Sequence, residues 1–166
     1  MKSLFTLFTD VPNAQKASED LLEIGFTEAE MNAVVLTDIA DESLEINRKT
    51  IRTDKTGEVG EKVVRGFASL VGGQQPVDLP DVGRVYAAGD IATLVADSAG
   101  DPHRESTDNL EHSLADSGLS SDAAHIYAEG VSGGKVLFWI HGEDDKVPGA
   151  VPVFREMKGQ HVQQVP

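Results

Sequence analysis

Two short apolar runs, at residues 4–8 and 136–140, constrain the fold more than any other feature of the sequence. Runs of this length that are rich in Phe, Leu, Val and Ile predict β-strands. Because side chains alternate between the two faces of a sheet, each run places apolar side chains on both faces. In the first run, Leu4 and Phe8 point to one face and Phe5 and Leu7 to the other. In the second run, Val136, Phe138 and Ile140 point away from Leu137 and Trp139. Both faces of the sheet therefore need a cover.

The second face of the sheet can be covered in two ways, and the sequence does not decide between them. Helices expected at 63–71 and 110–131 supply an internal cover. A second subunit supplies the other, because an apolar sheet face left bare favours association. In that case the interaction surface includes Leu4, Phe8, Leu137 and Trp139, and the chain is a homo-oligomer.

Residues 3–38 predict a first β-α-β half. Asp10 closes the first strand and suits the N-cap of a helix, with Pro12 in its first turn. The expected helix buries one apolar stripe and ends at Gly25, and a strand follows at 33–36. The stripe consists of Ala14, Ala17, Leu21 and Ile24.

Residues 39–109 predict an insertion with polar loops. The stretch 37–60 is dense in charged residues and predicts a polar connection. Helical spacing returns at 61–71 and ends at Gly72-Gly73. A turn-rich stretch from Pro76 to Gly83 precedes a short strand at 85–88, and residues 97–109 form a polar loop.

Residues 110–165 predict further helices and a second β-α-β half. A helix from Leu110 ends at Gly118, and Ser120 or Ser121 caps the next helix, which ends at Gly133-Gly134. After the strand at 136–140, we expect a helix near 147–158 that starts late, because Pro152 does not fit a helix interior. Residues 160–165 predict a weak final strand.

This order of elements predicts one domain, 1–166, of the α+β class. The pattern is that of a ferredoxin-like split β-α-β sandwich with an inserted, mostly helical middle segment. In that arrangement the two richest strands are central. The poorer strands, 33–36 and 161–165, fall on the edges, where polar residues are tolerated.

The charge of the chain limits its partners. Asp and Glu number 28 against 14 Lys and Arg, for a net charge of −14. Such a chain repels phosphate, so nucleic acids and anionic membranes are unsuitable partners. Cysteine is absent, and no apolar run approaches the roughly 20 residues of a membrane span. The opening apolar stretch is too short for a signal peptide, so we expect a cytoplasmic protein.

Few residues suggest catalysis, and we expect no metal or cofactor. His141, next to the acidic residues 143–145, is the best single candidate for a metal or acid–base site. His112 and Asp116 are spaced i, i+4, which favours a surface pair. Gly133-Gly134-Lys135 lacks the order of a phosphate loop and predicts a helix end. Aromatic residues that suit either a core or a ligand pocket are Phe67, Tyr86, Tyr127, Trp139 and Phe154.

Three blocks of the chain resemble the bacterial heat-induced general stress protein family. The first runs from Leu4 to Leu36 and includes the helix end Ile24-Gly25-Phe26. The second is Leu79–Gly89, and the third runs from Gly118 to Asp145 and includes Tyr127 and Gly133-Gly134. The chain departs from the family in the middle, where a long Gly/Ala-rich hairpin shrinks to 63–73. The resemblance implies a cytoplasmic, stress-linked protein and assigns no catalytic residue.

Three functions remain open at this point. The first is a non-catalytic general stress-response protein that acts through protein contacts or self-association. The second is a regulatory module that binds a small molecule, with a pocket near Trp139 and Tyr127, and it rests on fold analogy. The third is an enzyme that uses His141 and the adjacent acidic turn.

Overall fold

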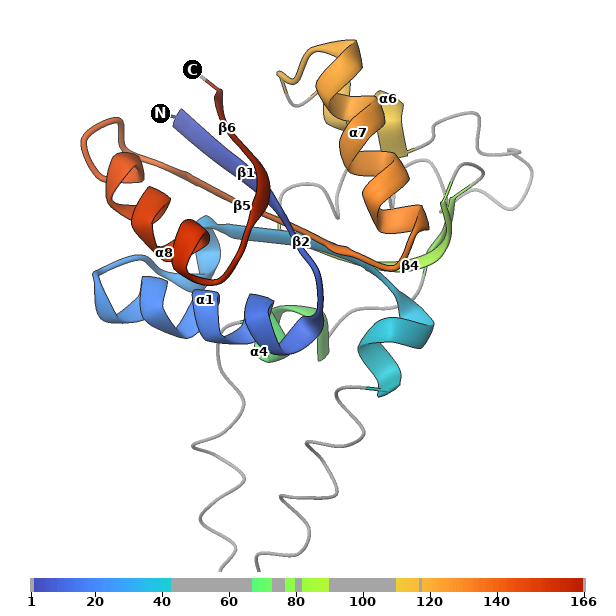
Figure 1. Ribbon diagram of the computed structural model, residues 1–166, viewed down its shortest axis with the longest axis horizontal. Helices are drawn as coiled ribbons and strands as arrows, with labels where there is room; N and C mark the ends of the chain where they lie inside the picture. Colours follow the sequence, from blue (N-terminus) through green and yellow to red (C-terminus); the bar gives the residue numbers. More distant parts are fainter. Residues whose placement is uncertain are drawn as a thin grey trace, which may run out of the picture.

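The computed structural model describes residues 2–42, 67–72, 77–79, 82–89, 110–116 and 118–165. Within these residues, helices pack on one antiparallel sheet of six strands, which is an α+β architecture (Figure 1). The elements are β1 (Lys2–Phe8), α1 (Val11–Glu23), η1 (Glu28–Glu30), β2 (Met31–Leu36), α4 (Phe67–Gly72), β3 (Val77–Leu79), β4 (Gly83–Ala88), α6 (Leu110–Asp116), α7 (Ser121–Ser132), β5 (Val136–Gly142), η2 (Val147–Ala150), α8 (Val151–Glu156) and β6 (Gln160–Val165). The expected loop at 97–109 and most of the connection at 37–60 lie outside the described residues.

The strand order of the sheet is β3-β4-β2-β5-β1-β6. β1 and β5 pair along their whole length, from Lys2 opposite Gly142 to Phe8 opposite Val136. Neither strand is at an edge, as their apolar sequences predict, and β6 is an edge strand, as expected. The expectation that 33–36 forms an edge is wrong. β4 pairs with β2, and β3 pairs with β4, so these strands extend the sheet beyond it.

The first face of the sheet is covered by α1, α4 and α8 (Figure 1). The rings of Phe8, Phe138 and Phe154 pack at its centre, with centroids 5.7–5.9 Å apart. α4 also lies on this face, because Phe67 and Val71 join the same core cluster. The expectation that the helix at 63–71 helps to cover the second face is therefore wrong for its described part.

The second face is covered by α6 and α7. Phe5 stacks between Tyr127 of α7, at 5.8 Å between ring centroids, and Trp139 of β5, at 4.9 Å. Gly130 lets α7 approach β1 closely, since a Cβ there would lie 2.5 Å from Leu7 Cδ1. The chain itself thus covers both faces with its own helices, which answers the question that the sequence left open.

The ends of α1 follow the expected signals. The Asp10 carboxylate accepts a hydrogen bond from the Asn13 N–H at 2.9 Å, and Gly25, with φ of +110°, closes a Schellman-type end. The predicted burial of Ile24 is wrong, because 52% of its surface is exposed. Ile24 is the C-cap residue, one position after the last helical residue, so its side chain leaves the stripe.

The C-terminal helices also begin and end where sequence signals place them. The Ser120 hydroxyl caps α7 by accepting a hydrogen bond from the Ala123 N–H at 3.2 Å. Gly134, with φ of +94°, ends this helix before β5, so Gly133-Gly134-Lys135 is a helix end and not a phosphate loop. The helix expected at 147–158 is a 3₁₀ turn followed by α8, because Pro152 is tolerated only in the first turn of an α-helix.

Candidate functional site

The four apolar residues proposed for an interaction surface lie inside the molecule. Leu4 and Phe8 belong to the core of the first face, and Leu137 and Trp139 belong to the core of the second. None of them is more than 4% exposed. They do not form one surface, because neighbouring positions of a strand point to opposite faces and the helices cover both.

His141 is paired with a serine across the sheet. It lies opposite Ser3 in the β1–β5 register, and Ser3 Oγ lies 2.7 Å from His141 Nδ1. This is the distance of a nucleophile and its base, but Ser3 is only 8% exposed. A nucleophile must be accessible to its substrate, whereas a hydrogen bond between two strands can be buried. The low exposure of Ser3 therefore favours a structural hydrogen bond with His141. The sequence pointed to His141 but missed Ser3, whose register position is visible only in the folded sheet.

His112 and His125 each contact exposed carboxylates. His112 Nε2 lies 3.5 Å from Asp116 on α6, as the i, i+4 spacing predicts. His125 lies between two carboxylates, with Nδ1 3.3 Å from Glu111 and Nε2 3.1 Å from Glu129. The hydrogen bond that His125 donates to Glu111, together with the charge of Glu129, raises the pKa of His125. Glu111 comes from α6 and could not be found from spacing alone. Among the described residues, no group of three or more His, Asp and Glu is arranged to hold a metal ion.

A partly buried ion pair joins η1 to the turn after β5. Lys146 Nζ lies 2.8 Å from Glu30 Oε1 and 4.7 Å from the centre of the Phe26 ring. The same Glu30 oxygen accepts the Thr27 N–H at 3.0 Å. Burial opposes ionisation of Glu30, but the bonds from Lys146 and Thr27 prevail and lower the pKa of this carboxyl. This ion pair holds η1 against the turn after β5, so its role is structural.

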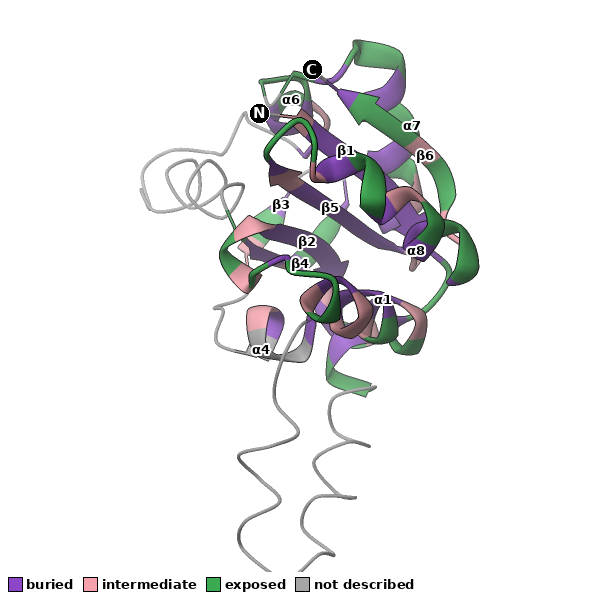
Figure 2. Cartoon of the chain, turned by 90° about the vertical axis from the view of Figure 1, so that its left-hand side faces the viewer, coloured by how far each residue is buried: buried purple, intermediate pink, exposed green. Residues whose placement is uncertain are grey.

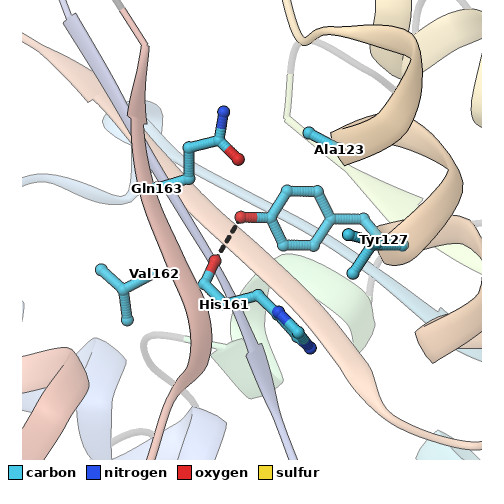
Figure 3. Close-up of a pocket in the computed structure, with 6 residues that line it drawn as sticks. Ala123, Tyr127, His161, Val162 and Gln163 are labelled. Atoms are coloured by element: carbon cyan, nitrogen blue, oxygen red, sulfur yellow. Dashed lines mark hydrogen bonds between the residues drawn. The ribbon is translucent and has the colours of Figure 1, made fainter.

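Among the described residues, a surface that combines an exposed apolar side chain with an edge strand lies between α7 and β6. A groove of about 270 Å³ lies there (Figure 3). It is lined by Ala123, Ile126, Tyr127, His161, Val162 and Gln163. Tyr127 reaches from α7 and donates its hydroxyl hydrogen to the backbone carbonyl of His161. Burial raises the pKa of Tyr127, so the hydroxyl stays protonated and remains a donor.

β6 itself is irregular at its start and regular afterwards. Ser3, Leu4 and Phe5 pair with Val165, Gln164 and Gln163, but the register shifts between Phe5 and Leu7. At the shift, His161 has φ of +52°, and the Thr6 hydroxyl donates to the Gln160 carbonyl at 3.0 Å. Most β6 side chains are exposed (Figure 2). The regular part, near the end of the strand, is thus the accessible edge beside the groove.

Of the other aromatic residues weighed as pocket walls, Phe67, Trp139 and Phe154 are core residues. Tyr86 is half-buried, and its hydroxyl donates to Asp41 at 2.7 Å. No helix within the described residues is long and apolar enough to span a membrane. Comparison of the chain with protein-family models, with curated proteins and with solved structures finds no match.

Proposed function

We propose that this chain is a non-catalytic general stress-response protein of the cytoplasm that acts through contacts between protein chains, including its own copies. The resemblance of three blocks to the general stress protein family supports the stress role. The accessible edge of β6 beside the exposed Ile126 supports the mode of action and is the observation that carries it. An open strand edge beside apolar surface suits the binding of another chain.

The proposal includes a ferredoxin-like core. Four strands in the order β6-β1-β5-β2, each antiparallel to its neighbour, support this assignment. α1 connects β1 to β2, while η2 and α8 connect β5 to β6, on the same face. β4, β3, α6 and α7 would then be additions to that core. α6 and α7 occupy the face that a plain sandwich of this kind leaves open.

Size-exclusion chromatography with light scattering tests the mode of action. We expect a mass above the 17.7 kDa of one chain, falling on dilution. A mass of one chain at every concentration contradicts self-association. For the stress role, we expect deletion of the gene to lower survival after heat shock in the organism that carries it, and unchanged survival contradicts that role.

A small-molecule-binding regulatory module is the second candidate, and the groove at Tyr127 is the observation that favours it. Its volume of about 270 Å³ is below the ~300–1,000 Å³ of typical ligand sites, and Trp139 does not line it. A thermal-shift screen separates the two candidates. A metabolite that stabilises the wild type but not a Tyr127→Ala variant favours the regulatory module, and a screen without a stabiliser weakens it.

A further inference from the structure

The two ends of β6 carry opposite charge. Near its start, Lys135 Nζ lies 2.7 Å from Gln160 Oε1, and Lys158 precedes the strand by two positions. Near its end, a Cβ on Gly118 would lie 3.5 Å from Val165, so the residues that lead into α7 lie there. Asp122 is in the first turn of α7. Lys2, next to Ser3 opposite Val165, also lies at this end, where it interacts with Asp144. The edge therefore has a basic end and an acidic end.

The strand between these ends has no charge of its own. Residues 160–165 contain no Asp, Glu, Lys or Arg, although the whole chain has a net charge of −14. Two copies of such a chain repel each other, and like charges placed face to face cost several kcal/mol. An uncharged edge is the place where two copies meet with the least repulsion.

The opposite ends make this edge complementary to itself. In a dimer with two-fold symmetry the same patch meets itself, so two β6 strands run antiparallel across the axis. In that arrangement the start of β6 in one copy, near Lys135 and Lys158, lies beside the end of β6 in the other copy, near Asp122. A partner with one sign of charge along its strand would match only one end of β6.

Ile126 adds an apolar contact next to the same edge. It is one of two large hydrophobic side chains with high exposure among the described residues, at 40%, and it lines the groove beside β6. A strand laid along β6 lies beneath this side chain and removes it from water. The other such residue, Ile24, is the C-cap of α1 and does not line this groove.

We propose that a second copy of this chain docks on β6, so that the two sheets continue across a two-fold axis and the Ile126 side chains are covered. The proposal rests on the self-association included in the proposed function and names its surface. The regular residues 163–165 supply the main-chain hydrogen bonds. The irregular start at His161 stays bound to Tyr127 and takes no part.

The test compares two matched variants of the full chain by sedimentation velocity. Ile126→Glu and Ile24→Glu each replace one exposed isoleucine by an acid. We expect the wild type and Ile24→Glu to have twice the mass of 17.7 kDa, and Ile126→Glu to have the mass of one chain. A dimeric Ile126→Glu overturns the β6 surface but leaves self-association intact. A monomeric wild type overturns both.

Two further variants keep the test decisive if Ile126→Glu does not fold. Gln163→Glu changes only an exposed side chain on the regular part of β6, and we expect it to be folded and monomeric. The chain has no cysteine, so single cysteines give clean cross-linking. Under oxidation we expect Gln163→Cys to form a disulfide-linked dimer and Ile24→Cys to stay unlinked. Equal cross-linking of the two variants overturns the proposal.

Discussion

The two edges of the sheet differ in length, charge and surroundings. β3 is only three residues long, and its exposed Asp78 lies 3.5 Å from Arg84 of β4. β6 is six residues long, carries no acid or base apart from His161, and borders a groove that Ile126 helps to line. Natural proteins protect strand edges by shortness, charge and bulges. The β3 edge has the first two protections, whereas β6 has only an irregularity at its start, so β6 is the less protected of the two described edges.

The largest expected effect comes from removing the ring that supports the β6 side of the sheet. Phe5→Ala removes the ring stacked between Tyr127 and Trp139, and we expect it to lower the free energy of unfolding by about 3–5 kcal/mol. Val85→Ala, in β4 near the other edge, is the control and costs about 2 kcal/mol. Urea unfolding measures the free energy of unfolding of both variants. Equal losses in the two variants would contradict the view that the ring of Phe5 makes the β6 side of the sheet the more stable one.

The hydroxyl that holds the start of β6 gives the next effect. Tyr127→Phe removes the hydrogen bond to the His161 carbonyl, and we expect a loss of about 1 kcal/mol in thermal unfolding. The ring stays in place, so the core is unchanged. Backbone amides of β6 should then exchange faster with solvent. Unchanged exchange in β6 would mean that Tyr127 does not hold this edge.

Much of this architecture was predictable from local sequence signals, because caps and apolar runs act over a few residues. Asp10, Gly25 and Ser120 mark helix ends where the structure has them. The strand at β5 follows from its apolar run. These features depend on neighbours in the chain, so a single sequence is enough to find them.

Apart from Ile24, which lies at a helix end, the misses come from pairing between distant segments. β3 went unrecognised because three residues with one charge show no pattern until β4 pairs with them. For the same reason, the sequence alone predicts an edge position for the strand at 33–36. Ser3 beside His141, and Tyr127 beside His161, lie together only through strand register and helix packing. The groove at β6 was invisible for that reason.

The pH dependence of stability tests the ion pair between Glu30 and Lys146, which lies away from both edges of the sheet. The folded-state pKa of Glu30 is lowered, so its bond with Lys146 contributes fully above the ordinary pKa of the carboxyl. The contribution is lost as the pH falls through the lowered folded-state pKa. We expect Lys146→Ala to cost about 0.5–1 kcal/mol at neutral pH and less in acid. A cost that does not shrink in acid would contradict the assignment to this ion pair.

The smallest expected effect on folding comes from the charges at the β3 edge. Asp78 and Arg84 are well exposed, so replacing both by Ser should change stability by less than about 0.5 kcal/mol. If charge protects this edge, the double variant should self-associate more than the wild type in light scattering. Association equal to that of the wild type would show that charge does not distinguish the two edges.

Hydrogen exchange as a function of protein concentration tests the central claim most directly. Mass spectrometry reports β6 and β3 in the same sample, so each edge serves as the control for the other. The account predicts that exchange in β6 slows as the concentration rises, while exchange in β3 stays constant. Exchange in β6 that is independent of concentration, or protection that increases at β3 instead, would contradict it.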